Sequence, residues 1–509
     1  MDRARHLLRS SAIVVVLFGL GKLTGLLRTR LVSGAFGTGS EFDAFTAANQ
    51  LPEVFVTLIS GGALAAAFIP VYSAYLTSRK LKEGAQLANS ILTLVIAVLG
   101  GISLLGIFLA PWITSNVLVP GFPPEQQELT AELMRIILIQ TTLFGISGVL
   151  SSILNAHQHF ALPTLAPVAL DVGYVFGLVF LVPEMGIIGL AWGTVLGGVL
   201  HILIQVPALM RFKFSYHPEI IMRLAGVREV IWLMIPRVVT LGAVQIADLV
   251  IINLASDPDL ETGSVSGYFY GYQLMQLPET LLGTAIAIVV FPTMAELYNG
   301  GDIEGLKRVS MNALRIIWTL TIPASVGLVL LGQPAIALLL EDGAFTADST
   351  RLVYSILLFF SFRIIAEASL EILARLFYAQ HDTVTPMIVA LLWLAINTIL
   401  AILLVDRLGV RGLALASTIA FTAQSLVLFL LNRRRLGYLQ DRQLLATAGR
   451  SLLGAAGMAA AILLVSQFVD ATFLFLIVGG MVGLVTYLAL TYAAGAREIP
   501  DLINVVRGR

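Results

Sequence analysis

The feature that most constrains the fold of this chain is a succession of long apolar segments separated by short polar breaks. About 20 helical residues cross the hydrocarbon core of a bilayer. The apolar runs are continuous rather than alternating, which excludes a transmembrane β-barrel. They predict about fourteen membrane-spanning helices, at residues 10–33, 45–77, 86–118, 130–156, 163–182, 186–210, 228–256, 265–298, 309–332, 350–379, 385–405, 410–432, 448–469 and 472–495.

The composition excludes most soluble classes of protein. Charged residues make up 12% of the 509 residues, about half the fraction of a soluble domain, and the mean hydropathy is +0.91. The chain has no cysteine, so it has neither disulfides nor thiolate metal sites. A net charge of zero gives no electrostatic reason to expect nucleic acid as a partner. No Walker A or HExxH motif occurs, and we expect a protein that is not an enzyme.

The distribution of lysine and arginine predicts the orientation. Alternate loops are rich in basic residues, which marks the cytoplasmic side. With a cytoplasmic N-terminus, the inside segments include Arg3, Arg5 and Arg9; Arg79, Lys80 and Lys82; and Arg433, Arg434 and Arg435. An even number of spans then places both termini in the cytoplasm.

The sequence repeats itself at a nearly constant spacing. Gln-Leu-Pro-Glu occurs at 50–53 and at 276–279. The break before Pro163 matches that before Pro386, and Gly186-x-x-Gly189-Leu-Ala matches Gly409-x-x-Gly412-Leu-Ala, both at the same shift along the chain. Three matches in the same order predict a duplication.

The repeat predicts an all-α polytopic membrane protein with two six-helix halves, at 1–212 and 213–436. Residues 437–509 add two helices and a cytoplasmic tail. Six is an even number, so a pseudo-two-fold axis along the membrane normal relates the halves. Two such halves enclose a central cavity, which favours alternating access over a static pore.

Charged residues inside the first two predicted spans are the candidates for a binding site. Lys22, Arg28, Asp43 and Glu53 lie there, where each costs ~2.5–3.5 kcal/mol on insertion scales. One interpretation is a cationic patch that binds an anionic headgroup. The other is an ion pair of Lys22 or Arg28 with Asp43 or Glu53 that holds helices together.

Glycines and prolines interrupt corresponding spans. Gly19, Gly21 and Gly25 permit a bend in the first span. The second span is broken by Pro52, Gly61-Gly62 and Pro70, and the eighth by Pro278, Gly283 and Pro292. Interrupted helices in corresponding positions indicate a transporter's site, although small residues also permit close helix packing.

The second half offers mostly neutral polar groups. Asp248 with Asn397 and Thr418 is a candidate set of oxygen ligands for a hard cation such as Na⁺. An Asp248 that is protonated or paired with arginine is the alternative.

Motifs along the chain carry a resemblance to a known family. They are Gly21-Lys22-Leu23-Thr24-Gly25-Leu26-Leu27-Arg28, Phe36-Gly37, Asp43-Ala44-Phe45, Leu51-Pro52, Gly62-Ala63, 67–71, Gly263-Ser264-Val265-Ser266 and 273–278. Together they resemble the MurJ (MviN) family of lipid II flippases, in the multidrug/oligosaccharidyl-lipid/polysaccharide exporter superfamily. The likeness covers the whole chain.

The resemblance implies an alternating-access flippase. Its expected substrate is undecaprenyl-diphosphate-linked peptidoglycan precursor, moved from the inner to the outer leaflet of the bacterial cytoplasmic membrane. In the family, basic residues of the first span line the cavity, which implies that role for Lys22 and Arg28, and Asp43 matches a family acid. The last two helices form a groove for the lipid tail. Some members bind Na⁺ near the position of Asp248.

The chain also departs from the family pattern. Val56 stands where a basic residue is common, and Gln273 and Gln276 replace an arginine and a glutamate. With Ser266, these two glutamines complete our set of substrate-binding candidates. The lost charges leave two alternatives open: a flippase for a lipid-linked O-antigen or exopolysaccharide unit, and a cation-coupled multidrug exporter.

The expected partners follow from this class of protein. They are an anionic, lipid-linked substrate and membrane lipid, with cell-wall synthesis proteins as associates of a monomer. We expect no cofactor other than Na⁺ as a coupling ion.

Overall fold

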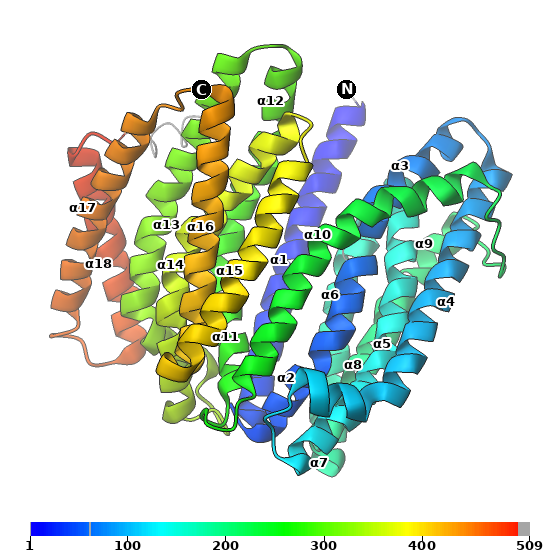
Figure 1. Ribbon diagram of the computed structural model, residues 1–509, viewed down its shortest axis with the longest axis horizontal. Coiled ribbons are helices and arrows are strands. Elements are labelled where there is room, and N and C mark those ends of the chain that lie inside the picture. The colour runs from blue at the N-terminus through cyan, green and yellow to red at the C-terminus, as the bar shows by residue number, and fades with distance from the viewer. Residues whose placement is uncertain (1, 61–62, 497–509) are drawn as a thin grey trace. The chain divides into compact units, whose positions relative to one another are not determined.

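A computed structural model describes residues 2–60 and 63–496 of the chain (Figure 1). These residues form α-helices joined by short loops, with no β-strand in the described part. The chain divides into two compact units: residues 1–265 with 342–344, and residues 266–341 with 345–509. Gly61-Gly62 and the end of the predicted cytoplasmic tail lie outside the described residues.

The first unit is organised around one long helix, α5, which contacts α2, α3, α4 and α8. α6 packs between α1 and α8. The helices of the unit are α1 (Asp2–Phe36), α2 (Ser40–Phe55), α3 (Ala63–Thr77), α4 (Leu81–Ile113), α5 (Pro124–Ala156), α6 (Ala161–Phe176), α7 (Val182–Met185), α8 (Ile187–Leu203), α9 (Val206–Arg211) and α10 (Ala225–Ala255).

The second unit is organised around α14, which contacts α12, α13 and α16. α17 and α18 pack against each other and against α13, as Figure 1 shows. The helices are α11 (Ser264–Glu279), which begins in the last residues of the first unit, α12 (Ala285–Asn299), α13 (Ile303–Leu340), α14 (Ala347–Ala379), α15 (Val384–Leu408), α16 (Val410–Leu436), α17 (Asp441–Val465) and α18 (Thr472–Ala493).

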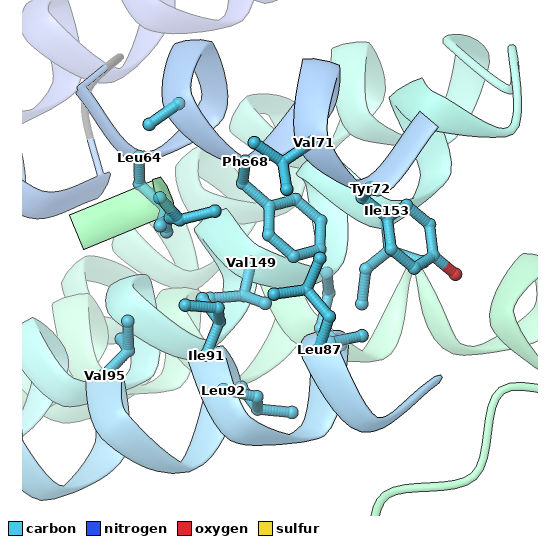
Figure 2. Packing of buried hydrophobic residues seen from close by; sticks show 14 of the residues in the cluster. Leu64, Phe68, Val71, Tyr72, Leu87, Ile91, Leu92, Val95, Val149 and Ile153 are labelled. Carbon is cyan, nitrogen blue, oxygen red and sulfur yellow. The ribbon is translucent and has the colours of Figure 1, made fainter. Parts of the chain in front are cut away.

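Apolar side chains join α3, α4 and α5 in the first unit. Figure 2 shows Phe68 of α3 among Leu87 and Ile91 of α4 and Val149 and Ile153 of α5. All five are at most 3% exposed. In a bilayer such contacts are stabilised by close packing rather than by removal of apolar surface from water.

Glycines bring α6 and α8 into backbone contact. A Cβ added to Gly177, which follows α6, would stand 2.6 Å from the Cα of Gly193, and one added to Gly193 would stand 2.9 Å from the Cα of Gly177. A side chain at either position would force the two backbones apart. These glycines therefore set the distance between the two helices.

Each of the two helices predicted to be interrupted near a Gln-Leu-Pro-Glu motif contains a π-helical turn, and its prolines lie within helix. A π-helical turn, η1 (Val56–Ser60), follows α2 after Pro52, and η4 (Thr280–Thr284) follows α11 after Pro278. Proline removes a backbone donor from the helical ladder, and π-turns accommodate such gaps. The two turns therefore begin within three residues of the ends of the two copies of the repeated motif.

Two further repeat positions share an unusual backbone conformation. Gln158 and His381 both have φ of +59°, and each lies two residues beyond the end of its helix, α5 and α14 respectively. Gly186 and Gly409 have φ of +58° and +61° at the starts of α8 and α16. Both pairs have the same separation along the chain as the matched sequence motifs, so the repeat extends from sequence to local structure.

Helix positions agree with the predicted spans, while several ends differ. The span predicted at 350–379 is α14, and that predicted at 472–495 is α18. α13 begins at Ile303 and ends at Leu340, beyond the predicted 309–332, because it includes a polar first segment at 303–308 and because the apolar run continues after Pro334 to Leu340. Ten described helices are long and apolar enough to cross a membrane.

The predicted halves and the two units are different divisions of the chain. The halves at 1–212 and 213–436 follow the repeat, whereas the first unit also contains α10. The division by repeat stays a prediction.

Candidate substrate site

Arg28 of α1 forms an ion pair with Asp171 of α6. Its Nη1 is 3.0 Å from Asp171 Oδ1, with the arginine side chain 25% exposed and the aspartate 8%. The guanidinium also lies over the ring of Tyr174, with Cζ 4.7 Å from the ring centroid, within the range of a cation–π interaction. Two groups of α6 therefore fix the position of this cation.

Thr24 binds the second oxygen of the same carboxylate. Its hydroxyl donates to Asp171 Oδ2 over 2.6 Å. Thr24 and Arg28 are four residues apart and share one face of α1. Gly25 lies on this side as well, since a Cβ there would stand 4.0 Å from Asp171 Oδ2. Asp171 thus accepts hydrogen bonds from side chains on two successive turns of α1.

The glycines of α1 do not interrupt the helix. The sequence predicts that Gly19, Gly21 and Gly25 permit a bend, whereas α1 runs as one helix from Asp2 to Phe36. Gly21 and Gly25 face α6, because their added Cβ atoms would each stand 4.0 Å from an α6 side chain, a distance at which a methyl group would still fit.

Glu53 of α2 is a second carboxyl close to Arg28. Arg28 acts on Glu53 electrostatically, and Tyr174 interacts with Arg28, Glu53 and Asp171. The alternative interpretation from the sequence, an ion pair of Arg28 with Asp43 or Glu53, names the wrong partner, because Arg28 pairs with Asp171. The partner lies on a helix that the sequence analysis did not consider.

Asp43 holds the loop that leads to α11. Its Oδ2 accepts a hydrogen bond from the backbone N–H of Gly263 over 2.7 Å, and Asp43 is 3% exposed. Gly263 has φ of +92° and lies against the backbone of Thr38, a place that a side chain could not occupy. Lys22, the other basic candidate, is an exposed residue of α1.

The second unit contains a buried arginine that the sequence analysis missed. Arg363 of α14 is 6% exposed, and its Nε donates to Glu367 Oε2 over 2.8 Å. Nη1 donates to Ser417 Oγ of α16 over 2.8 Å, and Cζ lies 3.9 Å from the ring centroid of Phe421. This half, expected to offer mostly neutral polar groups, therefore also contains a buried ion pair.

Gln276 belongs to the same network. Its Nε2 donates to Tyr272 OH over 2.9 Å and to Glu367 Oε1 over 3.1 Å. Gln273 lies half-buried on the same helix, and Ser266 is fully buried. The substrate-binding roles of these three polar residues stay predictions.

Further acids surround this network. Glu279 is 3% exposed and accepts a hydrogen bond from the hydroxyl of Thr284 over 3.4 Å. Glu371 forms an ion pair with Arg375, and Glu367 forms one with Arg363. Arg363 and Glu367 are four residues apart, a spacing at which side chains on one helix interact. This spacing in the sequence could have predicted the pair.

The three cation candidates fall in different units. Asp248 lies on α10 of the first unit, and Asn397 and Thr418 lie on α15 and α16 of the second. Asn397 is 2% exposed, and its Oδ1 accepts no hydrogen bond. Within the described residues, no group of three or more His, Cys, Asp or Glu side chains could hold a metal ion.

The described residues form a bundle of many apolar, membrane-length helices with charged clusters inside it, which is the architecture of a polytopic membrane protein. Its fold is similar to an inward-facing structure of a multidrug resistance MATE family transporter of the MOP superfamily. The TM-score is 0.70 at 18% identity, with 84% of this chain and 99% of the other covered. The chain belongs to the lipid II flippase MurJ family, whose model matches residues 32–480.

Individual members of the family are similar over most of their length. The lipid II flippase MurJ of Burkholderia cenocepacia is 28% identical over 82% of each chain. The probable lipid II flippase MurJ of Bdellovibrio bacteriovorus is 28% identical over 94% of this chain and 93% of its own. A lipid II flippase MurJ structure in an inward closed conformation has a TM-score of 0.82 at 25% identity, covering 97% of this chain and all of the other.

Proposed function

We propose that this protein is a lipid II flippase that works by alternating access in the bacterial cytoplasmic membrane. Membership of the family and the fold supply the class of activity. The observation that carries the substrate chemistry is Arg28, a partly exposed guanidinium inside an apolar helix. A diphosphate must leave water to cross the bilayer, and arginine offers a fork of donors matched to phosphate oxygens.

The test is transport of the substrate by the purified chain. Proteoliposomes that contain the protein should translocate fluorescent lipid II, and the gene should restore growth to a bacterium depleted of its own flippase. Translocation of a lipid-linked O-antigen unit but not of lipid II would favour the alternative substrate. Inability to restore growth, with normal insertion, would contradict the proposal.

The proposed topology has fourteen spans in two six-helix halves, followed by α17 and α18. The ten apolar helices support ten of these spans. The remaining four are α1, α10 and α14, which are long single helices, and α2 with α3, which forms one interrupted span. α14 carries six charged side chains, which form three ion pairs within the helix: Asp348 with Arg351, Arg363 with Glu367, and Glu371 with Arg375. The shared π-turns and backbone conformations support the two halves.

The orientation proposed for these spans has both termini in the cytoplasm, from the basic loops. α17 and α18 then supply the groove for the lipid tail, and the headgroup binds at Lys22 and Arg28. We propose a monomer that associates with cell-wall synthesis proteins and performs no catalysis.

Sodium is the proposed coupling ion. α15 and α16 are joined through Gly409 alone, so they run antiparallel. Trp393 and Phe421 contact each other with ring centroids 4.9 Å apart. Asn397 lies one turn beyond Trp393, and Thr418 one turn before Phe421, which places both at the same level on facing helices. The buried, unbonded Oδ1 of Asn397 suits a hard cation. Asp248 remains the charged ligand predicted from the sequence.

A further inference from the structure

The interaction of Asp171 with α1 has a consequence for anion binding. Both oxygens of this carboxylate are occupied, Oδ1 by Arg28 at 3.0 Å and Oδ2 by Thr24 at 2.6 Å. The carboxylate is 8% exposed, whereas the guanidinium is 25% exposed. Asp171 therefore contacts the buried side of the Arg28 guanidinium, and the other side of the guanidinium stays accessible.

A guanidinium has five N–H donors, and a single carboxylate cannot accept hydrogen bonds from all of them. Tyr174 supports the planar group from its face at 4.7 Å, so its orientation is set before any ligand binds. A phosphate that approaches the accessible part would meet a preformed donor. It would also meet the negative charge of Asp171 at close range, which opposes its binding.

We propose that Asp171 is a positioning residue for transport: it is the counter-ion of Arg28, and it competes with the diphosphate of the substrate. This inference rests on the proposed function, in which Arg28 binds that diphosphate. In the empty protein, Asp171 neutralises the cation inside the membrane. In the loaded protein, its charge weakens the hold on the substrate and permits release into the other leaflet.

The competition predicts a change of affinity with a definite sign. Removal of one negative charge at about 6–8 Å from a phosphate, at an effective dielectric constant of ~20, corresponds to at least a tenfold gain in affinity. If Asp171 only held α6 to α1, its replacement would weaken the binding of the diphosphate or leave it unchanged. Tighter binding with slower turnover therefore distinguishes a counter-ion from a structural contact.

The experiment measures binding and flipping with the full-length protein. Asp171→Asn keeps the size of the side chain and removes its charge. Equilibrium binding of lipid II and of undecaprenyl diphosphate is measured in detergent micelles, and flipping of lipid II in proteoliposomes. We expect Asp171→Asn to bind both lipids about tenfold more tightly and to flip lipid II several-fold more slowly at saturation. Asp171→Glu should restore both values to within about threefold of the wild type.

A matched control removes the same charge from another arginine–aspartate pair. Asp382, in the loop before α15, is 2.7 Å from Arg435. Asp382→Asn should leave both affinities unchanged. Inorganic pyrophosphate provides a readout without transport: it should raise the melting temperature of Asp171→Asn more than that of the wild type, because it replaces the missing carboxylate.

The outcomes separate this inference from the proposed function. Unchanged or weaker binding by Asp171→Asn, with no additional stabilisation by pyrophosphate, would overturn the counter-ion role. If the wild type bound undecaprenyl diphosphate but not lipid II, the proposed function would fail, and the counter-ion role would be judged on the bare diphosphate. If the wild type bound neither lipid, both would be rejected.

Discussion

Glu367 accepts a hydrogen bond of 2.8 Å from Arg363, which precedes it by four residues on α14, and the two side chains are 14% and 7% exposed. The pair lies on a helix with a largely apolar surface. Each charge is tolerated there because the other is present, since an unpaired charge in such a place costs several kcal/mol. The two side chains therefore depend on each other for their stability in the core of the second unit.

Removal of only one partner should be costly. Arg363→Met would leave the Glu367 carboxylate without its guanidinium, and we expect a loss of ~3–5 kcal/mol in the free energy of unfolding. The double variant with Glu367→Leu should recover much of this loss, because no unpaired charge remains. Denaturation of the purified protein in detergent measures both. Losses that simply add in the double variant would show that the two charges do not depend on each other.

The glycine contact between α6 and α8 gives a second prediction. Gly177→Ala should destabilise the first unit by about 1–3 kcal/mol, because its Cβ would stand 2.6 Å from a backbone atom that cannot move alone. Gly100→Ala on α4 is the matched control, since nothing lies within 4 Å of its added Cβ. Alanine there should be neutral or stabilising. Equal melting temperatures for the two variants would contradict the close approach.

The fold could be predicted from the sequence because its determinants are local. The length of an apolar run sets the length of a span, and the π-turns follow the prolines of the repeated motif. The partners of the charged residues could not be predicted in this way. Asp171 is far from Thr24 along the chain, and no local pattern joins them. Arg363 is different, because its spacing of four residues from Glu367 is a local pattern that predicts an ion pair on one helix.

The orientation of the chain can be tested with reporters in its loops. Fusions at Pro123, before α5, and at Asp342, between α13 and α14, should read outside. Fusions at Lys80, between α3 and α4, and at Arg434, near the end of α16, should read inside, because basic loops stay in the cytoplasm. An inverted reading at two of these four sites would reverse the assignment.

Sodium binding should appear as thermal stabilisation. An ion that binds only the folded state raises its stability in proportion to the logarithm of ion concentration. We expect NaCl to raise the melting temperature of the wild type more than KCl does, and Asp248→Asn to abolish the difference. Asp382→Asn, which lacks a charge at another site, should keep the sodium effect. An equal effect in wild type and Asp248→Asn would exclude Asp248 as a ligand.

Arg28 gives the most direct test of the proposed function. Arg28→Ala should abolish flipping and growth in a flippase-depleted strain, because the diphosphate loses its donor. Arg28→Lys should keep only part of the activity, since an ammonium cannot form the paired hydrogen bonds of a guanidinium. Growth, flipping and melting temperature are measured for each variant.

The melting temperature separates binding from structure at this position. Arg28→Ala leaves Asp171 with Thr24 as its remaining partner on α1, so some loss of stability is expected in either case. If Arg28 were only structural, the double variant Arg28→Ala/Asp171→Ala, which leaves neither charge, would regain both stability and flipping. If Arg28 binds the diphosphate, the double variant regains stability while transport stays absent. Normal growth with Arg28→Ala alone would remove the binding role.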